Sequence, residues 1–289
     1  MNILLSANSK FFRPLCTLIY SLYKTQTEKL NLYFIKGNIT EEEIVSLKDL
    51  CRQLHIEIHI LSFYNTVEKE LNKIRTTFSS ILEEKRLSVE TYYRLFIIPF
   101  LPLERILWLD ADCLVQKDLK DFYYQNFENR YLVACDHCDI DWTEDLEFSI
   151  VDSSRKRQHY FNAGVLLLNL ELLRYHDFYR KDAQPLLSKF ILNFNTEPLL
   201  SEFDQSILNV TLRTNVKWTD PLKYNCPQNW FFYFGQRKDH PKVYEILENA
   251  YILHYCGNPK PWDIDYQDKR KKEYYLKVEE ELNSFLKEK

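Results

Sequence analysis

The feature that most constrains this fold is an apolar run that ends in two carboxylates. The run and its continuation read Arg105-Ile106-Leu107-Trp108-Leu109-Asp110-Ala111-Asp112-Cys113-Leu114-Val115. A short, continuously apolar run is typical of a strand that is buried on both faces. Such strands lie in the middle of parallel α/β sheets, and ligands bind at their carboxyl ends. The stretch therefore predicts a central strand whose end opens into a binding site.

The spacing of Asp110 and Asp112 suggests a metal site at that end. If the backbone stays extended, residues i and i+2 project to the same side. Two neighbouring carboxylates repel each other unless a cation lies between them or one is protonated. Mg²⁺ and Mn²⁺ prefer such oxygen ligands. A polar turn explains the same residues, because Asp is also a turn former, so the pattern alone leaves both interpretations open.

Composition narrows the class of protein. With 289 residues, 45% of them hydrophobic, the chain is long enough for one large domain with a sizeable core. A net charge of -4 gives no general attraction to nucleic acid. Only 4 glycines occur, and neither G-x-G-x-x-G nor a Walker sequence is present. A nucleotide would therefore be held by side chains, helix ends and a metal.

The cysteines, the N-terminal pattern and the lack of a long apolar run lead us to expect a reduced, cytoplasmic protein. The 7 cysteines are irregularly spaced and odd in number, and Cys135-x-x-Cys138 lacks a second pair at zinc spacing. The N-terminus has no signal-peptide pattern, and no apolar run approaches the roughly 18 residues of a membrane span. The basic cluster Lys269-Arg270-Lys271-Lys272 is either solvated, which we favour, or contacts acidic lipids at the inner face of the membrane.

Strand and helix patterns alternate along the first half of the chain. Strands are predicted at 3–7, 30–35 and 56–60, and helices at 11–23 and 40–54, the second opened by a Thr40 cap with a Glu three residues on. This order predicts a parallel sheet with right-handed crossovers. Further strands are predicted at 131–135, 165–170 and 251–255, with a polar lid at 136–159 and a charged helix from 267 to the end.

Several polar residues interrupt apolar stretches, and each has two interpretations. Arg94 forms either an internal ion pair or a contact to phosphate or sugar. Asn162 is either a turn residue or a ligand contact, and Asp204 either caps a helix or binds a ligand. His254 ends an apolar run and is either a core histidine or a metal ligand.

Five motifs occur together in a characteristic order. They are Thr91-Tyr92-Tyr93-Arg94-Leu95, Leu107-Trp108-Leu109-Asp110-Ala111-Asp112, Tyr160-Phe161-Asn162-Ala163-Gly164-Val165, Asp204-Gln205, and His254-Tyr255-Cys256-Gly257 followed by Lys260-Pro261-Trp262. In this order the chain resembles glycosyltransferase family 8, the group of a bacterial lipooligosaccharide α-galactosyltransferase and of glycogenin. The resemblance spans residues 1–265 as a catalytic domain and leaves 266–289 as a C-terminal helical extension.

The resemblance implies a GT-A fold, which is a Rossmann-like, mostly parallel central sheet flanked by helices. It also implies transfer from UDP-galactose or UDP-glucose, with retention, to a saccharide, glycolipid or glycoprotein glycan. By motif position the metal ligands are Asp110, Asp112 and His254, a set that suits Mn²⁺ better than Mg²⁺. Gln205 and Asp204 take the catalytic positions. The implied donor-binding residues are Ala7, Asn8, Arg94, Asp110, Ala111, Asn162, Ala163, Asp204, Gln205, Gly257 and Lys260.

The loop after the first strand departs from the family pattern. Family members often carry acidic residues there, whereas this chain has Asn8-Ser9-Lys10, and Ser206 also stands where an acid is common. A non-catalytic nucleotide-sugar-binding protein of the same fold is therefore the alternative. A nucleotidyltransferase is disfavoured, because it gives no reason for the segment from His254 to Trp262.

Overall fold

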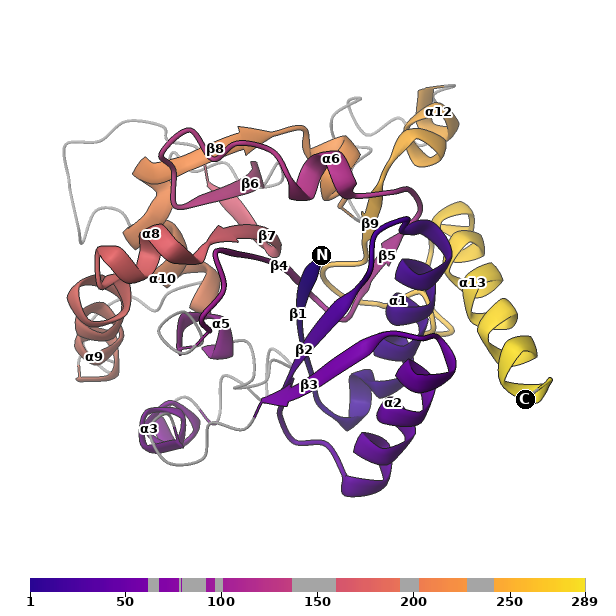
Figure 1. The fold of residues 1–289 in the computed structure, drawn as a ribbon, viewed down its shortest axis with the longest axis horizontal. Coiled ribbons are helices and arrows are strands. Elements are labelled where there is room, and N and C mark those ends of the chain that lie inside the picture. Colours follow the sequence, from indigo (N-terminus) through magenta and orange to yellow (C-terminus); the bar gives the residue numbers. More distant parts are fainter. Residues whose placement is uncertain are drawn as a thin grey trace. The chain divides into compact units, whose positions relative to one another are not determined.

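The protein is an α/β fold with a seven-stranded sheet, which confirms the predicted fold class. The computed structural model describes residues 1–61, 68–77, 79, 92–96, 101–136, 160–192, 203–227 and 242–288 (Figure 1). The strand order is β3-β2-β1-β4-β7-β6-β8, and a separate pair is formed by β5 and β9. The chain divides into two compact units. Unit 1 is Met1–Ile60, Leu109–Gln125 and Thr219–Lys289, and unit 2 is Leu61–Trp108 and Asn126–Trp218.

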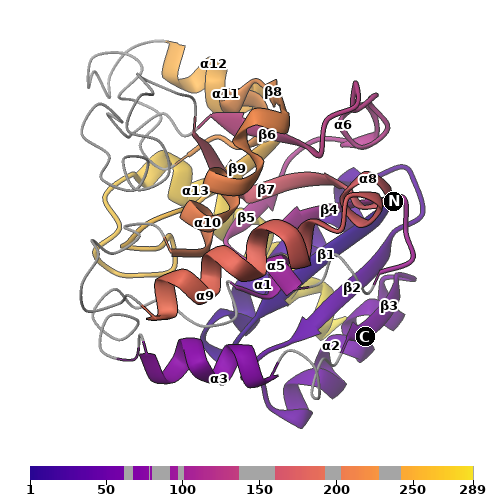
Figure 2. The ribbon, with the colours of Figure 1, turned by 90° about the vertical axis from the view of Figure 1, so that its left-hand side faces the viewer.

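Unit 1 contains the N-terminal strands and the C-terminal helix. Its elements are β1 (Asn2–Ala7), the 3-10 helix η1 (Ser9–Phe11), α1 (Phe12–Thr25), β2 (Asn31–Lys36), α2 (Glu41–Gln53), β3 (Glu57–Leu61), β5 (Cys113–Val115), α6 (Lys120–Tyr123), α11 (Pro221–Tyr224), α12 (Lys242–Asn249), β9 (Ile252–His254) and α13 (Lys269–Lys287). Strands β1, β2 and β3 lie side by side in Figure 2. β1 and β2 pair in parallel from Asn2 opposite Asn31 to Ala7 opposite Lys36, as the strand–helix alternation predicts.

The helices of unit 1 bury the apolar positions that their sequences place on one face. Leu15, Leu18, Ile19 and Leu22 of α1 are buried at helical spacing. Helix α2 begins with the predicted capping box, in which the Thr40 hydroxyl accepts from the Glu43 N–H and the Glu43 carboxylate accepts from the Thr40 N–H. Local sequence thus fixes where this helix starts.

The C-terminal helix α13 packs beside α1 (Figure 1). One of its lysines is buried. Glu279 and Glu281 of α13 pair with Arg13 and Lys24 of α1. The prediction that the cluster at 269–272 is solvated is wrong for Lys271, which is 0% exposed. Its ammonium donates to the carbonyls of Cys226 and His254, each at 2.9 Å, which offsets part of the cost of burying a cation.

Unit 2 contains the central strand and the strands that follow it. Its elements are α3 (Glu68–Thr77), α5 (Tyr93–Phe96), β4 (Arg105–Leu109), β6 (Leu132–Asp136), β7 (Phe161–Asn169), α8 (Leu170–Tyr175), the π-helix η5 (Tyr179–Ala183), α9 (Gln184–Leu192), α10 (Phe203–Leu212), the 3-10 helix η6 (Arg213–Asn215) and β8 (Val216–Thr219). The apolar runs predicted as buried strands are β4 and β7. β6 pairs antiparallel with β7, Leu132 opposite Leu168, so the sheet is mixed.

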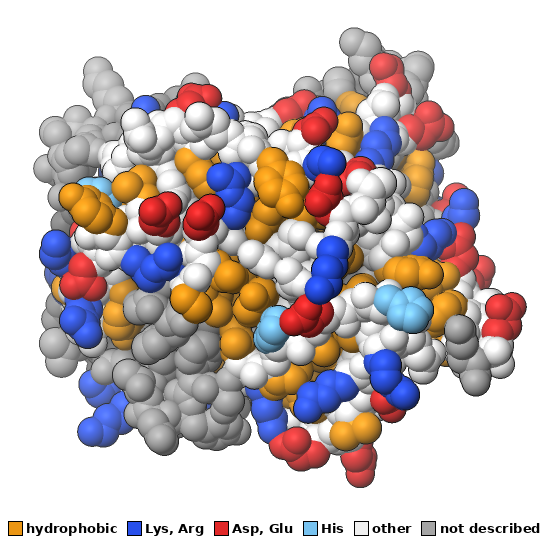
Figure 3. Space-filling model, in the orientation of Figure 1, with side chains coloured by type: hydrophobic (Ala, Val, Ile, Leu, Met, Phe, Trp, Pro, Cys, Tyr) orange, Lys and Arg blue, Asp and Glu red, His pale blue; other side chains and the backbone are white. Residues whose placement is uncertain are grey.

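Some predictions fall outside the described residues. They concern Cys138 and the lid predicted at 136–159, of which the structure describes only Asp136, the last residue of β6. Within the described ranges, no helix combines the length and the apolar character needed to cross a membrane. On the face drawn in Figure 3, basic and acidic side chains of the described residues are interspersed, so this face presents no concentrated basic surface.

Candidate functional site

The Asp110-Ala111-Asp112 segment is a turn between β4 and β5. β4 ends at Leu109, and the Cys113 N–H donates to the Asp110 carbonyl at 3.0 Å, which closes the turn before β5 begins. The extended backbone that would place both carboxylates on one side is therefore absent here. Asp112 is buried at 9% exposure, whereas Asp110 is half-buried. Of the two aspartates, Asp112 is the one that the turn carries into the interior.

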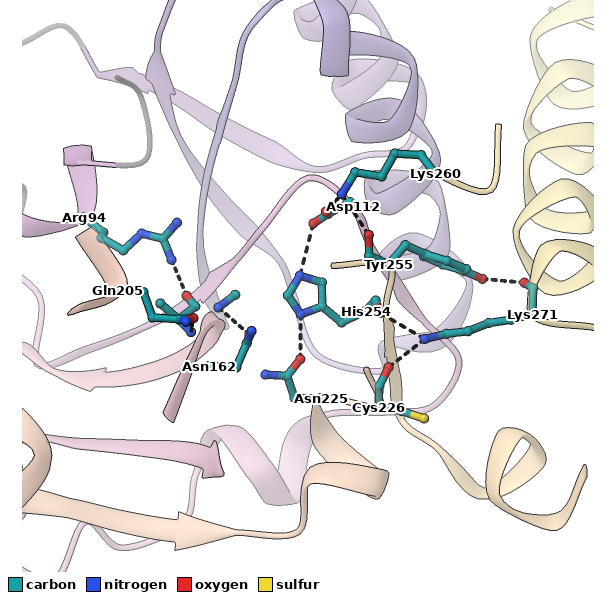
Figure 4. Close-up of polar contacts among 12 residues, drawn as sticks. Arg94, Asp112, Asn162, Gln205, Asn225, Cys226, His254, Tyr255, Lys260 and Lys271 are labelled. Carbon is teal, nitrogen blue, oxygen red and sulfur yellow. Dashed lines mark hydrogen bonds and ion pairs between the residues drawn. The ribbon is translucent and has the colours of Figure 1, made fainter. Parts of the chain in front are cut away.

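The antiparallel pairing of β5 with β9 brings His254 to Asp112. Cys113 lies opposite His254 in the register, and the Tyr255 N–H donates to the Asp112 carbonyl at 3.0 Å. Side chains directly opposite each other project from the same face of a strand pair. Asp112 lies in the turn just before β5, and its Oδ1 atom is 3.3 Å from the His254 Nε2 atom (Figure 4).

A second contact fixes the orientation of the His254 ring. Its Nδ1 lies 2.8 Å from the side-chain oxygen of Asn225, at the end of α11. An amide oxygen can only accept, so Nδ1 carries a proton and donates it. Nε2 then faces the Asp112 carboxylate with either a proton or a lone pair. A lone pair there repels the carboxylate unless a cation lies between them, so the geometry suits either an imidazolium–carboxylate pair or a bound metal.

Lys260 holds the other oxygen of Asp112. Its ammonium donates to Asp112 Oδ2 at 2.6 Å and to the Tyr255 carbonyl at 2.8 Å (Figure 4). Burial alone raises the pKa of Asp112, but the charges of Lys260 and His254 outweigh it, and the net pKa is lowered. Asp112 is therefore an ionised carboxylate in a buried setting, as a metal ligand has to be.

Three side chains in unit 1 could together hold a metal ion. Their ligand atoms come from Asp112, Cys113 and His254 and all lie within 4.8 Å of one another. The residues fit a divalent ion, since a carboxylate and an imidazole converge while Lys260 and Asn225 hold them from behind. Asp110, the third ligand by motif position, is not in this group.

The remaining predicted residues of unit 1 lie on the connections after strands. Ala7 ends β1, and Asn8 caps η1 by accepting from the Lys10 N–H at 3.1 Å. Ala111 is buried within the turn. Gly257 has a φ of 79°, in the left-handed region that favours glycine. A Cβ built there would meet no heavy atom within 4 Å, so the backbone conformation rather than crowding calls for glycine.

Unit 2 contains a second group of polar side chains, formed by Arg94 of α5 and by Asp204 and Gln205 of α10. Arg94 Nε lies 3.0 Å from Asp204 Oδ2, and both side chains are less than 10% exposed. The Arg94 guanidinium also donates to the Ala163 carbonyl and stacks over Trp108, 4.6 Å from the ring centroid. The internal ion pair, one of the two interpretations of Arg94, is present.

Backbone contacts hold the side chains around Gln205. The Gln205 Oε1 atom accepts from the Ala163 N–H at 2.7 Å, and the Asn162 side-chain oxygen accepts from the Gly164 N–H at 2.9 Å (Figure 4). Asn209 ties α10 to β7, because its side chain accepts from the Phe161 N–H and donates to the Phe161 carbonyl. Ser206 is buried, with its hydroxyl 3.2 Å from that of Tyr160.

Four contributors to these groups were missed by reasoning from the sequence. They are Cys113, Asn209, Asn225 and Lys271. Cys113 had a signal, since it directly follows Asp112 and pairs with the strand of His254. The other three act through partners elsewhere in the chain, and no local motif marks them.

Comparison with known proteins adds a family and a fold. A sequence model of glycosyl transferase family 8 matches residues 2–265. The chain is 24% identical to general stress protein A of Bacillus subtilis, over 95% of this chain and 92% of that protein. It is also 24% identical to a lipopolysaccharide 1,2-glucosyltransferase of Escherichia coli, over 82% of this chain and 73% of that protein. The fold matches the galactosyltransferase LgtC, solved with donor and acceptor sugar analogs, with a TM-score of 0.71, 22% identity and 96% coverage of both chains.

Proposed function

The chain belongs to glycosyl transferase family 8, and we propose that it is a metal-dependent retaining hexosyltransferase. It moves galactose or glucose from a UDP-sugar to a saccharide, glycolipid or glycoprotein glycan. The observation that carries this proposal is the buried contact of Asp112 with both His254 and Lys260, at 3.3 and 2.6 Å. These are the residues that the family pattern assigns to the metal and the diphosphate.

Asp112 and His254, with Asp110 as the third ligand by motif position, would hold Mn²⁺, with Mg²⁺ as the alternative ion. Such an ion stabilises the negative charge that develops on the departing UDP. The Asn225 side-chain oxygen accepts the hydrogen bond from Nδ1 of His254, which would leave Nε2 to bind the ion. Asp112 is kept ionised at neutral pH by Lys260, so it needs no deprotonation to act as a ligand.

The segments after the strands would bind the nucleotide. Lys260 and the Gly257 backbone would contact the diphosphate. The Lys260 ammonium supplies a positive charge, and the backbone at Gly257, with its φ in the left-handed region, supplies an N–H donor for the phosphate oxygens. Ala7, Asn8 and Ala111 contact the nucleoside. Asn8 supplies an amide in place of the acidic residues common in the family, which still allows hydrogen bonds to a uracil edge.

Arg94, Asn162, Ala163 and Asp204 would hold the donor sugar, with Gln205 beneath the anomeric carbon. The Gln205 carbonyl oxygen is fixed by the Ala163 N–H, so it can stabilise positive charge at that carbon without reorganising. An amide is a poor nucleophile, so we favour attack by the acceptor from the side of the leaving group. The alternative is a covalent adduct on Asp204, whose carboxylate is held by the ion pair with Arg94.

The proposal also covers the domain bounds and the cellular location of the protein. We assign residues 1–265 to the catalytic domain and 266–289 to a C-terminal helical extension. We place the protein in the cytoplasm, with contact to the inner face of the membrane as an option. None of the 6 described cysteines forms a disulfide, which fits a reducing compartment.

The alternative is a non-catalytic nucleotide-sugar-binding protein of the same fold. It is motivated by Asn8 and Ser9, which replace acidic residues after β1. It is disfavoured because Asp204 and Gln205 are both present and held by specific contacts. A protein that only binds has no need for a positioned amide beneath the anomeric carbon.

Donor hydrolysis tests the proposal. Purified protein with Mn²⁺ is incubated with UDP-galactose, UDP-glucose, GDP-mannose and CMP-sialic acid, with and without EDTA, and nucleotide release is measured. We expect release of UDP from one UDP-hexose, which EDTA and Asp112→Ala both abolish. Asp49→Ala, an exposed aspartate on α2, is the matched control and should leave the rate unchanged. Release that persists in EDTA would overturn the role of the metal.

A further inference from the structure

Cys113 shares the buried group of Asp112 and His254, although no motif assigns it a role. The carboxylate oxygen, the Sγ atom and the imidazole nitrogen all lie within 4.8 Å of one another. Cys113 stands directly opposite His254 in the β5–β9 pairing, so both side chains project from the same face. The thiol therefore faces the same space as the imidazole.

The other two members are oriented as metal ligands usually are. Nε2 of His254 points at Asp112 Oδ1 from 3.3 Å, while Asn225 holds Nδ1 at 2.8 Å. Asp112 Oδ2 is bonded to Lys260 at 2.6 Å, which leaves Oδ1 for an ion. Outer partners of this kind fix ligand orientation in metal sites. The Cys113 thiol is thus the third candidate ligand, beside Asp112 and His254, whose orientations are fixed by their outer partners.

The spacing suits a small divalent ion. Around a tetrahedral ion with bonds of about 2.0–2.3 Å, ligand atoms lie roughly 3.3–3.8 Å apart. Because no two of the three ligand atoms are more than 4.8 Å apart, binding an ion would bring them closer by at most about 1.5 Å. One thiolate, one imidazole and one carboxylate favour a borderline-soft ion of the Zn²⁺ class, whereas Mn²⁺ prefers oxygen ligands.

We infer that Cys113 is a metal ligand together with Asp112 and His254, and that the site binds Zn²⁺-class ions more tightly than Mn²⁺. A metal–sulfur bond forms as the S–H bond breaks, and the proton passes to the solvent. For the proposed transferase this means that Zn²⁺ competes with the catalytic ion. The inference concerns the metal site of that proposed function, but it is tested by ligand chemistry and not by turnover.

Co²⁺ absorption gives the direct test, because a thiolate bound to Co²⁺ adds a sulfur-to-metal charge-transfer band in the near ultraviolet. Co²⁺ is titrated into the full chain as wild type, Cys113→Ser and Cys256→Ser. Cys256 is the matched control, since it lies two residues after His254 and is half-buried. We expect the band in the wild type and in Cys256→Ser, and its loss in Cys113→Ser.

Competition binding gives a second, independent readout. Zn²⁺ and Mn²⁺ dissociation constants are measured for the same three proteins against a chromophoric chelator. Losing a ligand should weaken Zn²⁺ binding by about tenfold or more, as loss of an outer partner already does, and should change Mn²⁺ binding much less. Equal losses for the two ions would contradict a role for sulfur.

Several outcomes would overturn the inference. One is a wild-type spectrum without the charge-transfer band, and another is a band that survives in Cys113→Ser or disappears in Cys256→Ser. If Cys113→Ser fails to fold by circular dichroism, Cys113→Ala is titrated in its place, and a band that survives in that variant overturns the inference. A protein that shows the band but releases no UDP from any donor would keep this inference and refute the transferase. UDP release by a protein without the band would support the transferase and refute the role of Cys113 as a ligand.

Discussion

Asp112 is the residue on which the contacts of unit 1 converge. Its carboxylate meets His254 and Lys260, and its carbonyl accepts from the Tyr255 N–H. Burial disfavours its charge, yet Lys260 and His254 keep the pKa of Asp112 below its ordinary value. A carboxylate held ionised in this way is prepared for a metal, and its geometry depends on both strands of the β5–β9 pair.

Gln205 is the residue whose substitution distinguishes an enzyme from a protein that only binds the nucleotide sugar. Its amide oxygen is fixed by the Ala163 N–H, and its proposed task exists only in the transition state. We expect Gln205→Ala to lower UDP release by about 100-fold or more while the dissociation constant for UDP stays unchanged.

Rate measurements on the donor sugar and calorimetry with UDP check this expectation. Gln267→Ala, an exposed glutamine that precedes α13, is the control and should match the wild type in both. A Gln205→Ala variant with full turnover would favour the non-catalytic interpretation of the site.

At the scale of elements, α13 supports the strand that carries His254. Lys271 donates from this helix to the carbonyls of His254 and Cys226, and the Tyr255 hydroxyl donates back to the Lys271 carbonyl at 2.8 Å. Burial lowers the pKa of Lys271, so the carbonyl contacts have to offset an unfavourable setting for its charge. The helix is thus joined to β9 through polar contacts as well as apolar ones.

Removing this ammonium should destabilise the protein. We expect Lys271→Met to lower the free energy of unfolding by about 1–3 kcal/mol, because two carbonyls lose a donor in the interior. Lys269→Met, at the exposed start of the same helix, should have no measurable effect. Urea unfolding of the two variants checks the difference, and equal stabilities would contradict the role assigned to Lys271.

The start of α2 carries a pH dependence of its own. The Ser9 hydroxyl, followed by the Thr40 N–H, lowers the pKa of Glu43. A lowered folded pKa contributes stability above the unfolded value of about 4.3, and this stability is lost as the pH falls through the folded value. We therefore expect Glu43→Gln to be less stable than the wild type at pH 7, with a difference that shrinks below about pH 4.

Chemical denaturation at several pH values measures that difference. Glu42→Gln is the matched control, because it removes a charge from the same turn of α2 at an exposed position. A Glu43→Gln difference that stays constant from pH 7 to about pH 3.5 would show that the carboxylate is not what stabilises this helix start.

At the scale of the whole molecule, the sequence predicted the strands and helices well because their signals are local. The buried runs at β4 and β7 and the capping box at α2 each lie within one stretch of chain. The turn at Asp110–Asp112 was ambiguous because Asp both ends strands and forms turns. Contacts made at a distance, such as Asn225 with His254, leave no local pattern. Lys271 was misjudged because a fully buried lysine is rare.

The proposed function requires that this chain bind a uridine diphosphate through a metal held by Asp112 and His254. Calorimetry of UDP binding tests it most directly, with Mn²⁺, with EDTA, and with Asp112→Ala in place of the wild type. The account predicts UDP binding in the presence of Mn²⁺ that is weakened at least about tenfold by EDTA and by the substitution. No UDP binding under any condition, or equal binding with and without the metal, would contradict it.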